Sequence, residues 1–293
     1  MAARILDGKV LAQTIKDALK KEIALLKQKT GNSPKILNLL VGSDQASLTY
    51  ANSQKRTAEE IGIDYKLITM PADISQKELL DFIDGVNRDA DIHGVMIHSP
   101  LPTKLNYQRL VDQIHPAKDI EGVSVNNMGK LVFGKTKIIP STPASVMEHI
   151  RSTGINLNGK EAVIVGRSEI VGKPLSLLLL EENATVSICH SQTSKAGQLE
   201  DYVKRADVLI VSVGKPGLIK GEWIKKGALV IDVGINHVGT KIVGDIEFDA
   251  AKERAGFITP VPGGVGPVTV VMLMRNGVEA FKVQTKDKAD IKI

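Results

Sequence analysis

Residues 161–191 read EAVIVGRSEIVGKPLSLLLLEENATVSICHS and decide the fold. An apolar run at 162–165 ends at Gly166, a polar turn leads into a helical pattern at 175–182, and a β-rich run follows at 184–189. Strand, glycine turn, helix and strand are the opening of a nucleotide-binding βαβ unit. The turn G-R-S-E-I-V-G departs from the G-x-G-x-x-G spacing, so an ordinary βαβ unit with a tight turn is the alternative.

The residues after the second strand bear on the choice of nucleotide. In NAD-binding units an acidic side chain at this place usually holds the ribose 2′-hydroxyl. Here the positions are His190-Ser191-Gln192-Thr193, without a carboxylate, and Arg167 lies in the phosphate turn. A hydroxyl and a guanidinium suit a 2′-phosphate. The pattern therefore favours NADP, with NAD as the alternative.

The composition indicates a soluble α/β protein. The chain has 293 residues, enough for two domains, with 43% hydrophobic and only 3% aromatic residues, as in parallel sheets covered by helices. Its single cysteine, Cys189, fits a reducing compartment. The N-terminus has no apolar signal segment, and no run approaches the 18 apolar residues of a membrane span. We expect a cytoplasmic protein without membrane contact.

The net charge of +5 and pI of about 9.1 are compatible with anionic ligands such as dinucleotides. A Lys-rich solvated surface explains them equally well. The positive charges are scattered, without the basic–aromatic interleaving of nucleic-acid binders, so no nucleic-acid partner is expected. No Cys/His/Asp cluster has metal-ligand spacing, so no metal is expected either.

Alternating strand and helix patterns fill the first half of the chain. Expected helices are 11–28, 47–61, 74–87 and 107–113, and expected strands are 35–41, 65–70 and 92–98, followed by a short hairpin around Gly134. This βαβα order predicts a three-layer α/β domain. The turn at 140–143 then introduces a helix at 144–153, capped by Thr142 with Pro143 at its first position.

The second half continues the nucleotide-binding pattern. Strands are expected at 208–213 and 229–233, and the turn Gly234-Ile235-Asn236 falls at the carboxyl edge of the sheet, where ligands bind in such folds. The segment TPVPGGVGPVT at 259–269 predicts a shaped loop because it is crowded with glycine and proline. A long apolar helix follows at 270–282.

Several motifs together resemble the methylenetetrahydrofolate dehydrogenase/cyclohydrolase family, essentially from end to end. They are PVPGGVGPVT at 260–269, GRSEIVGKP at 166–174, ATVSICHSQT at 184–193, DVGIN at 232–236, and Tyr50 followed by AEEIGI at 58–63. The resemblance implies two three-layer α/β domains with a cleft between them, the second Rossmann-like, and a homodimer. We expect a folate-binding catalytic domain at 1–142, completed by the helix 270–293, and an NAD(P)-binding domain at 143–269.

The resemblance also implies an activity and its residues. The family oxidises 5,10-methylenetetrahydrofolate to the methenyl form by hydride transfer to a nicotinamide, and its cyclohydrolase step then gives 10-formyltetrahydrofolate. By position, the cofactor residues are Gly166, Arg167, Ser168, Ser191 and Ile235, and the folate residues are Tyr50, His98, Glu121, Pro262, Gly263 and Gly264. The catalytic candidates are Tyr50, Gln54, His98 and Glu121.

This chain departs from the family pattern at the folate site. The family carries Tyr-x-x-x-Lys, whereas Gln54 stands four residues after Tyr50, and Lys55 would leave the face of the helix that Tyr50 occupies. His98 replaces the usual Gln, and Glu121 in KDIEG replaces an Asp that is usually a pterin ligand. Ser141 replaces the Cys of the family's PCTP.

These substitutions are expected to affect ring opening but not dehydrogenation. Hydride leaves the methylene carbon with help from the adjacent nitrogen lone pair, so positioning suffices and no general base is required. Ring opening moves protons and needs a group that titrates near neutrality, which Gln54 is not. We therefore expect a dehydrogenase whose cyclohydrolase activity is lost or weak.

Two alternatives remain from the sequence. One is a bifunctional enzyme in which His98 or Lys55 moves the proton; the other is a folate- or nucleotide-binding protein without turnover, against which the intact cofactor turn argues. His98 is more simply a hydrogen-bonding group, like the Gln it replaces. His190 is assigned no chemistry, and the remaining histidines are expected to be structural or on the surface: His93, His115, His149 and His237.

Overall fold

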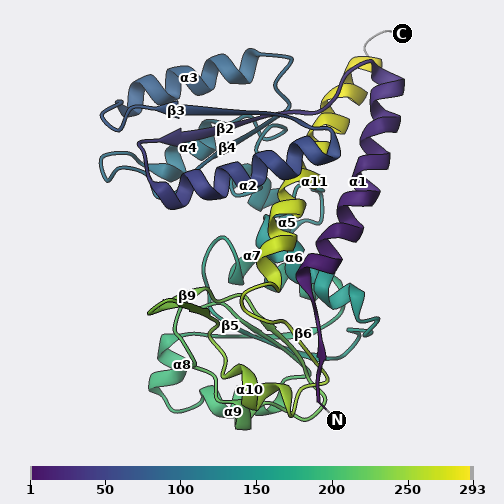
Figure 1. Ribbon diagram of the computed structural model, residues 1–293, viewed down its shortest axis with the longest axis vertical. Coiled ribbons are helices and arrows are strands. Elements are labelled where there is room, and N and C mark those ends of the chain that lie inside the picture. Colours follow the sequence, from purple (N-terminus) through teal and green to yellow (C-terminus); the bar gives the residue numbers. More distant parts are fainter. Residues whose placement is uncertain (1, 291–293) are drawn as a thin grey trace. The chain divides into compact units, whose positions relative to one another are not determined.

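The computed structural model describes residues 2–290, except the side chains of Ala46 and of residues 286–290. The chain forms two compact units, which are described separately (Figure 1). Unit 1 takes in the chain up to Gln13 and Thr142–Thr269, and unit 2 takes in Thr14–Ser141 and the chain from Val270 onward. The expected division placed residues 1–13 in the first domain; instead they join the nucleotide-binding sequence.

A six-stranded parallel sheet forms unit 1. Its strand order is β1-β11-β8-β7-β5-β6, comprising β1 (Arg4–Ile5), β11 (Phe257–Ile258), β8 (Leu229–Asp232), β7 (Val208–Val211), β5 (Glu161–Val165) and β6 (Thr185–Cys189). The chain runs from β5 to β6 on one side and returns to β7 on the other. The carboxyl end of β5 is therefore a topological switch point, where open α/β sheets bind ligands.

Helices cover both faces of this sheet, so the predicted Rossmann-like layers are confirmed. Figure 1 shows α6 (Ser141–Ser152) and α7 (Gly172–Glu181) on one side, and α8 (Ser191–Lys195), α9 (Leu199–Arg205) and α10 (Phe248–Lys252) on the other. Between β8 and α10 lies the small antiparallel hairpin of β9 (Asn236–Val238) and β10 (Lys241–Val243).

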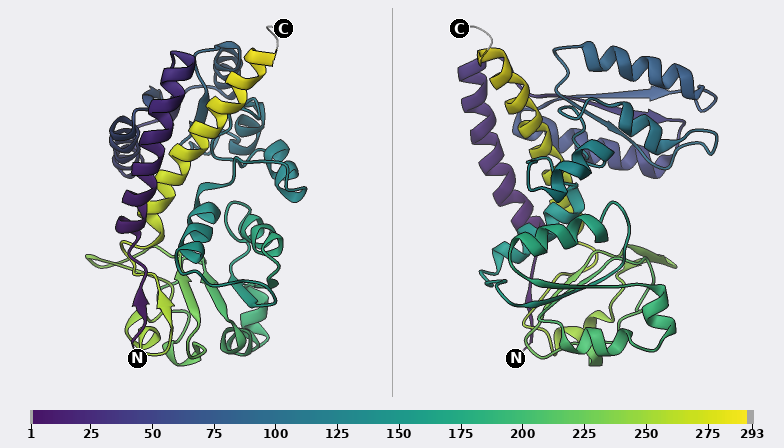
Figure 2. Two further views of the ribbon diagram at one scale, coloured as in Figure 1. Left: turned by 90° about the vertical axis from the view of Figure 1, so that its right-hand side faces the viewer. Right: turned by 180° about the vertical axis from the view of Figure 1, so that it is seen from behind.

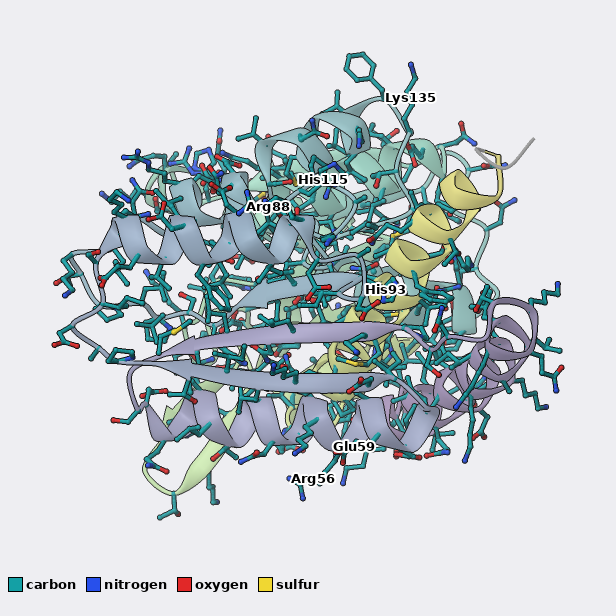
Figure 3. The ribbon with its side chains drawn as sticks, turned by 90° about the horizontal axis from the view of Figure 1, so that it is seen from above. Arg56, Glu59, Arg88, His93, His115 and Lys135 are labelled. Carbon is teal, nitrogen blue, oxygen red and sulfur yellow. The ribbon has the colours of Figure 1, made fainter. Side chains whose placement is uncertain are left out.

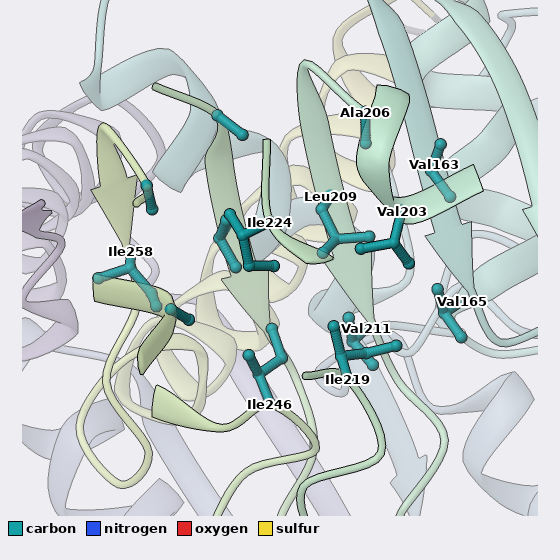
Figure 4. Close-up of a cluster of buried hydrophobic side chains, with 14 of the residues drawn as sticks. Val163, Val165, Val203, Ala206, Leu209, Val211, Ile219, Ile224, Ile246 and Ile258 are labelled. Atoms are coloured by element: carbon teal, nitrogen blue, oxygen red, sulfur yellow. The ribbon is translucent and has the colours of Figure 1, made fainter. Parts of the chain in front are cut away.

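The unit 1 core consists of aliphatic side chains from the strands and the helices that cover them (Figure 4). Val163 and Val165 of β5, Leu209 of β7 and Val203 of α9 are at most 2% exposed. Each such side chain contributes about 1.5–3 kcal/mol through burial. Strands covered on both faces read as continuous apolar runs, which explains why β5 and β7 were recognisable in the sequence.

Unit 2 contains a three-stranded parallel sheet of order β3-β2-β4, made by β2 (Lys35–Val41), β3 (Asp64–Met70) and β4 (Gly94–Ile97). Figures 1 and 3 show α2 (Gln45–Ile61) on one face and α3 (Gln76–Arg88) on the other. The core packs Leu37 and Leu39 of β2 against α3 and α4 (Tyr107–Gln113). This is the predicted three-layer arrangement.

Two long helices complete unit 2. α1 (Gly8–Thr30) and α11 (Val265–Asp290) lie side by side along their unit 2 portions (Figure 2). Lys282 Nζ reaches Glu22 Oε1 at 2.8 Å, and Asn276 Nδ2 donates to the carbonyl of Ile120 at 2.8 Å. The C-terminal helix thereby contacts both α1 and the segment around Ile120, which lies beside β4.

Some local expectations were wrong. The region before Gly134 is the helix α5 (Val125–Val132), not a hairpin, because Ser124 accepts the amide hydrogen of Asn127 as a helix N-cap. The helix at 141–152 begins at Ser141, so Thr142 lies inside it rather than capping it. Likewise α11 begins at Val265, within the segment expected to be irregular. Across residues 2–290, no helix is long and apolar enough to cross a membrane.

Candidate active site

The turn after β5 leaves no room for a side chain at two of its positions, Gly166 and Gly172. Gly166 has φ of +133°, and a Cβ there would lie 2.3 Å from the carbonyl oxygen of Ser212. A Cβ at Gly172 would lie 2.2 Å from the carbonyl oxygen of Gly166. Both positions therefore require glycine, and the first turn of α7 can approach a ligand without obstruction.

Arg167 and Ser168 follow Gly166 and are exposed at the switch point. The Ser168 hydroxyl accepts the amide hydrogen of Val171 at 3.2 Å, so it also shapes the turn. Val171 provides no side-chain cap for α7; the Lys173 amide donates to the Ser168 carbonyl at 3.0 Å, and Pro174 has no N–H. The turn offers a hydroxyl and a guanidinium beside a helix N-terminus, which suits an anion.

At the end of β6, His190 is the N-cap of α8. Its Nδ1 accepts the amide hydrogen of Gln192 at 3.2 Å, and its own amide donates to Thr193 Oγ1 at 3.1 Å. Ser191 is the exposed first residue of this short helix. The side chain and the amide of His190 are therefore both hydrogen-bonded within the first turn of α8.

Ile235 is 62% exposed in the loop after β8. Two buried carboxylates, Asp245 and Asp232, hold this region through hydrogen bonds, and the sequence analysis did not identify either of them. Asp245 Oδ2 accepts the amides of Val213 and Gly214 at 2.7 and 3.0 Å, and its Oδ1 accepts Asn236 Nδ2 at 2.8 Å. One side chain therefore ties the loop after β7 to the loop after β8.

Asp232 supports the same region from the end of β8. Its Oδ1 accepts the amides of Gly234 and Asp245 at 3.0 and 3.1 Å, and its Oδ2 accepts the amide of Ile246 at 2.9 Å. Burial raises the pKa of the Asp232 carboxyl to about 6, against the opposing effect of these hydrogen bonds. A buried Asp in the motif DVGIN was the available sequence clue.

The segment after β11 contains Pro262, Gly263 and Gly264. Gly263 has φ of +101°, and its carbonyl accepts the amide of Gly8 at 2.8 Å. A Cβ on Gly8 would lie 1.7 Å from the carbonyl oxygen of Gly264. The start of α1 therefore packs backbone to backbone on this loop, and Gly8 is a further residue that the sequence analysis missed.

All of these unit 1 residues lie at one edge of the sheet. Gly166, Ser191, Ile235 and Pro262 follow the carboxyl ends of β5, β6, β8 and β11, which run parallel. The predicted cofactor residues are thus brought to the edge where a dinucleotide binds in this type of fold.

In unit 2, helix α2 carries two of the catalytic candidates on one face. The helix begins at the N-cap Asp44, whose side chain accepts the amide of Ser47 at 2.7 Å, and it ends at Gly62 with φ of +92°. Tyr50 and Gln54 are four residues apart and so share a face. Tyr50 is 40% exposed, whereas Gln54 is 0% exposed.

Gln54 belongs to a buried polar network drawn from three further segments. Its Oε1 accepts Asn38 Nδ2 at 2.8 Å and the Tyr65 hydroxyl at 2.9 Å. Asn38 of β2 also contacts the Tyr65 hydroxyl of β3 directly, and its Nδ2 lies 2.8 Å from His98 Nε2, just after β4. Sequence reasoning named Gln54 and His98 but missed the two strand residues that hold them.

This network carries no charge near neutral pH. Burial lowers the pKa of the His98 imidazole and raises that of the Tyr65 phenol, and Gln54 and Asn38 do not titrate. Two buried atoms, Gln54 Nε2 and Asn38 Oδ1, have no hydrogen-bond partner among the described residues. Near neutral pH, Gln54, Asn38, Tyr65 and His98 are therefore neutral hydrogen-bonding groups.

Tyr50 and Glu121 lie beside this network. The Tyr50 ring meets the His98 ring edge-on with centroids 5.9 Å apart, and burial raises the pKa of the Tyr50 phenol. Glu121 Oε2 accepts the amide of Ile97 at 3.3 Å and lies 3.4 Å from the Tyr107 hydroxyl. The four predicted catalytic candidates are thus brought together within unit 2.

Glu121 is the group in this cluster whose titration falls near neutrality. Burial, and secondarily the neighbouring Asp119 carboxylate, raise the pKa of Glu121 to about 7. Asp119 itself accepts the amides of Gly122 and Ser124 at 3.0 and 2.9 Å, and so shapes the turn that presents Glu121. Tyr107, missed by the sequence analysis, supplies the facing hydroxyl.

Lys55 does not join the site. Its side chain is 48% exposed and lies 3.8 Å from Glu59 Oε1, one helical turn further along α2. Figure 3 shows Arg56 and Glu59 projecting from the side of α2 that faces away from the sheet. The alternative in which Lys55 reaches the folate site is therefore not supported by this geometry.

Within the described part of the chain, no group of three or more His, Cys, Asp or Glu side chains is arranged to hold a metal ion. The polar groups at the two sites are amides, hydroxyls, backbone groups, an imidazole, the Arg167 guanidinium and the Glu121 carboxyl. These suit hydrogen bonding to organic ligands and anions.

Comparison with known proteins gives consistent matches over both halves. Residues 6–121 match the family model for the tetrahydrofolate dehydrogenase/cyclohydrolase catalytic domain, and residues 140–285 match its NAD(P)-binding domain. The bifunctional protein FolD of Bacillus pumilus is 45% identical over 283 residues, which are 96% of this chain and 99% of the relative.

Two solved structures are similar along the whole chain. The bifunctional FolD methylenetetrahydrofolate dehydrogenase/cyclohydrolase from Campylobacter jejuni has a TM-score of 0.93 at 39% identity, covering 96% of this chain and 99% of that one. The Trypanosoma brucei methylenetetrahydrofolate dehydrogenase-cyclohydrolase, complexed with NADP and an inhibitor, has a TM-score of 0.92 at 36% identity, covering 97% and 99%.

Proposed function

The chain belongs to the tetrahydrofolate dehydrogenase/cyclohydrolase family, and on that premise we propose an NADP-dependent 5,10-methylenetetrahydrofolate dehydrogenase whose ring-opening activity is lost or weak. The observation that carries the proposal is Gln54, which is fully buried in a neutral network at the place where the family pattern has Lys. Dehydrogenation survives this change because it needs positioning and moves no proton.

Unit 1 is assigned the cofactor. Gly166, Arg167 and Ser168 hold its phosphates at the switch point, while Ser191 and the Arg167 guanidinium favour the 2′-phosphate of NADP. Ile235 packs beside it from the loop that Asp245 supports. The bound nicotinamide supplies the hydride acceptor, and the chain supplies binding and orientation.

Unit 2 is assigned the folate. Tyr50 stacks on the substrate from its partly exposed position, His98 orients it as a neutral hydrogen-bonding group, and Glu121 pairs with the pterin ring. Pro262, Gly263 and Gly264 of unit 1 contribute backbone to the same substrate. Gln54 acts by accepting a hydrogen bond from Asn38, which in turn contacts His98, rather than by exchanging protons.

A bifunctional enzyme is the second candidate, favoured by one observation. The Glu121 carboxyl has a pKa of about 7 and so can exchange a proton near neutral pH. His98, the candidate from the sequence, is less suited, because burial lowers its pKa and its Nε2 faces Asn38. In this reading Glu121 rather than His98 or Lys55 would serve ring opening.

A two-wavelength assay with methylenetetrahydrofolate and NADP tests the proposal and separates these candidates. One wavelength follows reduced cofactor and the other follows the methenyl product. Equal accumulation of both is expected. A rise of reduced cofactor without methenyl product would establish ring opening and refute its loss, and no signal at either wavelength would favour a binding protein without turnover. Repeating the assay with NAD tests the cofactor preference.

We also propose that the protein is a homodimer formed through the β6 edge of unit 1, in a reducing, cytoplasmic compartment. β6 is an edge strand, and its Ile188 is 39% exposed beside the half-buried Val186. An apolar, unpaired strand edge is suited to association with a second copy. Sedimentation of the wild type and of Ile188→Lys tests this, and a monomeric wild type would refute it.

A further inference from the structure

The C-terminal helix α11 carries a buried amide, Asn276, within its unit 2 portion. Asn276 is 2% exposed, and its neighbours on the helix, such as Leu273 and Val278, belong to the buried core. The sequence analysis expected this helix to be apolar and did not single out Asn276. The amide has no part in the function proposed above.

Asn276 joins two backbone segments that are distant in the sequence. Its Nδ2 donates to the carbonyl oxygen of Ile120 at 2.8 Å and to that of Ile139 at 2.7 Å. Its Oδ1 accepts the amide hydrogen of Ile139 at 3.4 Å. Both Nδ2 hydrogens are therefore used. An apolar side chain of the same size would fill the space equally well, but it would leave both carbonyls without this donor.

The Ile120 carbonyl belongs to the peptide group that joins Ile120 to Glu121. Because a peptide group is planar, holding its oxygen also orients the Glu121 nitrogen, and with it the direction in which the Glu121 side chain leaves the backbone. On the other side, the Ile120 amide donates to the Val95 carbonyl of β4 at 3.3 Å. The backbone just before Glu121 is thus held between β4 and α11.

The backbone just after Glu121 is packed against the second of these segments. Gly122 has φ of +69°, and its amide donates to Asp119 Oδ1 at 3.0 Å. A Cβ on Gly122 would lie 3.2 Å from the carbonyl oxygen of Ile138. The turn around Glu121 and residues 138–140 therefore lie in contact, and Asn276 hydrogen-bonds to both.

The Glu121 carboxyl itself has only long contacts to hold it. Its Oε2 lies 3.3 Å from the amide nitrogen of Ile97 and 3.4 Å from the Tyr107 hydroxyl. Both distances exceed the roughly 2.9 Å of a typical N–H···O bond or the shorter O–H···O bond. The place of the carboxyl therefore depends mainly on where the backbone presents it.

We propose that Asn276 is a positioning residue for Glu121: its amide fixes the Ile120–Glu121 peptide group and thereby sets where the carboxyl meets the folate. The inference rests on the proposed function, because it assumes that Glu121 contacts folate. It adds a residue of the C-terminal helix to the groups on which the unit 2 site depends.

The test compares Asn276→Leu, which removes the donor at similar volume, with Gln284→Leu as the matched control. Gln284 Nε2 donates to the carbonyls of His93 and Ala117 at 2.7 and 3.0 Å, so it also links α11 to unit 2 backbone, but not to the peptide group before Glu121. Both variants should be less stable than wild type. The KM for methylenetetrahydrofolate should rise in Asn276→Leu alone, by about 3- to 30-fold with little change in kcat.

A second variant keeps the shape of the side chain. Asn276→Asp retains an acceptor for the Ile139 amide but replaces the Nδ2 donor by an oxygen, so its KM should rise in the same way. It also serves as the test if the Leu protein does not fold.

The titration of Glu121 gives a readout that does not depend on catalysis. The groups that face its carboxyl are Asp119 of the same turn, Tyr107 of α4 and Tyr50 of α2. Burial is the main reason that the pKa of Glu121 is raised to about 7, so a turn released to water should let this pKa fall toward its ordinary value. The part of the pH-dependent unfolding that Glu121→Gln removes should therefore shrink in Asn276→Leu and persist in Gln284→Leu.

An unchanged KM or an unchanged Glu121 titration in Asn276→Leu would overturn the proposal, and so would equal effects in Gln284→Leu. Absence of dehydrogenase activity in the wild type would instead refute the proposed function. The Glu121 titration would then decide by itself whether Asn276 fixes the turn.

Discussion

The cofactor turn of unit 1 is shaped by backbone packing, whereas the folate cluster of unit 2 is held together by side-chain hydrogen bonds. The turn consists of backbone, with Gly166 and Gly172 packed so closely that no Cβ fits. The cluster consists of side chains, with Gln54, Asn38 and Tyr65 joined by hydrogen bonds from three separate elements. Backbone geometry admits few substitutions, whereas a side-chain network can exchange its members together. For this reason we expect substitutions to be tolerated more readily in the unit 2 cluster than in the unit 1 turn.

The largest effect is expected from Gly166→Ala. A Cβ placed 2.3 Å from the Ser212 carbonyl, at φ of +133°, forces the turn to move. Strain of about 3 kcal/mol corresponds to at least a roughly 100-fold loss of cofactor affinity, which calorimetry with NADP would measure. Gly159→Ala is the control, since Gly159 also has positive φ (+69°) but open space around it. If both variants bind NADP equally well, the turn is not the backbone-limited site described above.

The next largest effect is the pH dependence of the free energy of unfolding, to which Glu121 of unit 2 contributes. Glu121 has a pKa of about 7 in the folded protein, against an ordinary value near 4.5, so the folded state holds this proton more tightly than the unfolded state. Its contribution to the free energy of unfolding is greatest below pH about 4.5 and is lost as the pH rises through about 7. Between pH 5 and 8 the expected loss is about 2–3 kcal/mol, from roughly 1.4 kcal/mol for each of the two units between pH 5 and the folded pKa of about 7.

Urea unfolding of wild type and Glu121→Gln between pH 5 and 8 would measure this loss, because the amide removes the titration. Asp232, with a pKa of about 6, contributes the same trend from unit 1 and is cancelled in the difference. Glu59→Gln, at an exposed position on α2, should leave the slope as in wild type. Parallel curves for wild type and Glu121→Gln would contradict the assigned titration.

A smaller effect is expected from breaking the network itself. Tyr65→Phe removes a hydroxyl that reaches both Gln54 and Asn38, and should cost about 1–2 kcal/mol of unfolding free energy and raise the folate KM. A double-mutant cycle with Asn38→Leu should give a coupling of about 0.5–2 kcal/mol. Tyr202→Phe in unit 1 is the matched control and should change stability by less than about 0.5 kcal/mol. Strict additivity of the two unit 2 changes would mean that they do not form one network.

The contrast between local backbone patterns and contacts between distant residues also determines how much of the structure could be predicted from the sequence. The layers and the cofactor turn follow from local patterns, because apolar periodicity and glycine placement can be read from neighbouring residues. The pairing of β1 with β11, which moves residues 1–13 into unit 1, joins segments about 250 positions apart and leaves no local trace.

The folate cluster was only half predictable. Tyr50, Gln54, His98 and Glu121 were found through their motif positions, but Asn38 and Tyr65 lie in strands and resemble core residues. Asn38 interrupts the apolar run KILNLLV, and a polar residue buried there requires a partner. That partner could not be named from the sequence, since it depends on which strand-end and helix residues meet in space.

The smallest effect, close to zero, is expected from Lys55→Gln. Lys55 lies on the exposed side of α2 and its ion pair with Glu59 is 3.8 Å long, so its removal should change stability by less than about 0.5 kcal/mol. Because its side chain lies outside the network around Gln54, the ratio of methenyl product to reduced cofactor should also be unchanged. A fall in residual ring opening in this variant, seen in the two-wavelength assay, would mean that α2 rearranges when folate binds. The unit 2 site would then resemble the family pattern more closely than its buried Gln54 indicates.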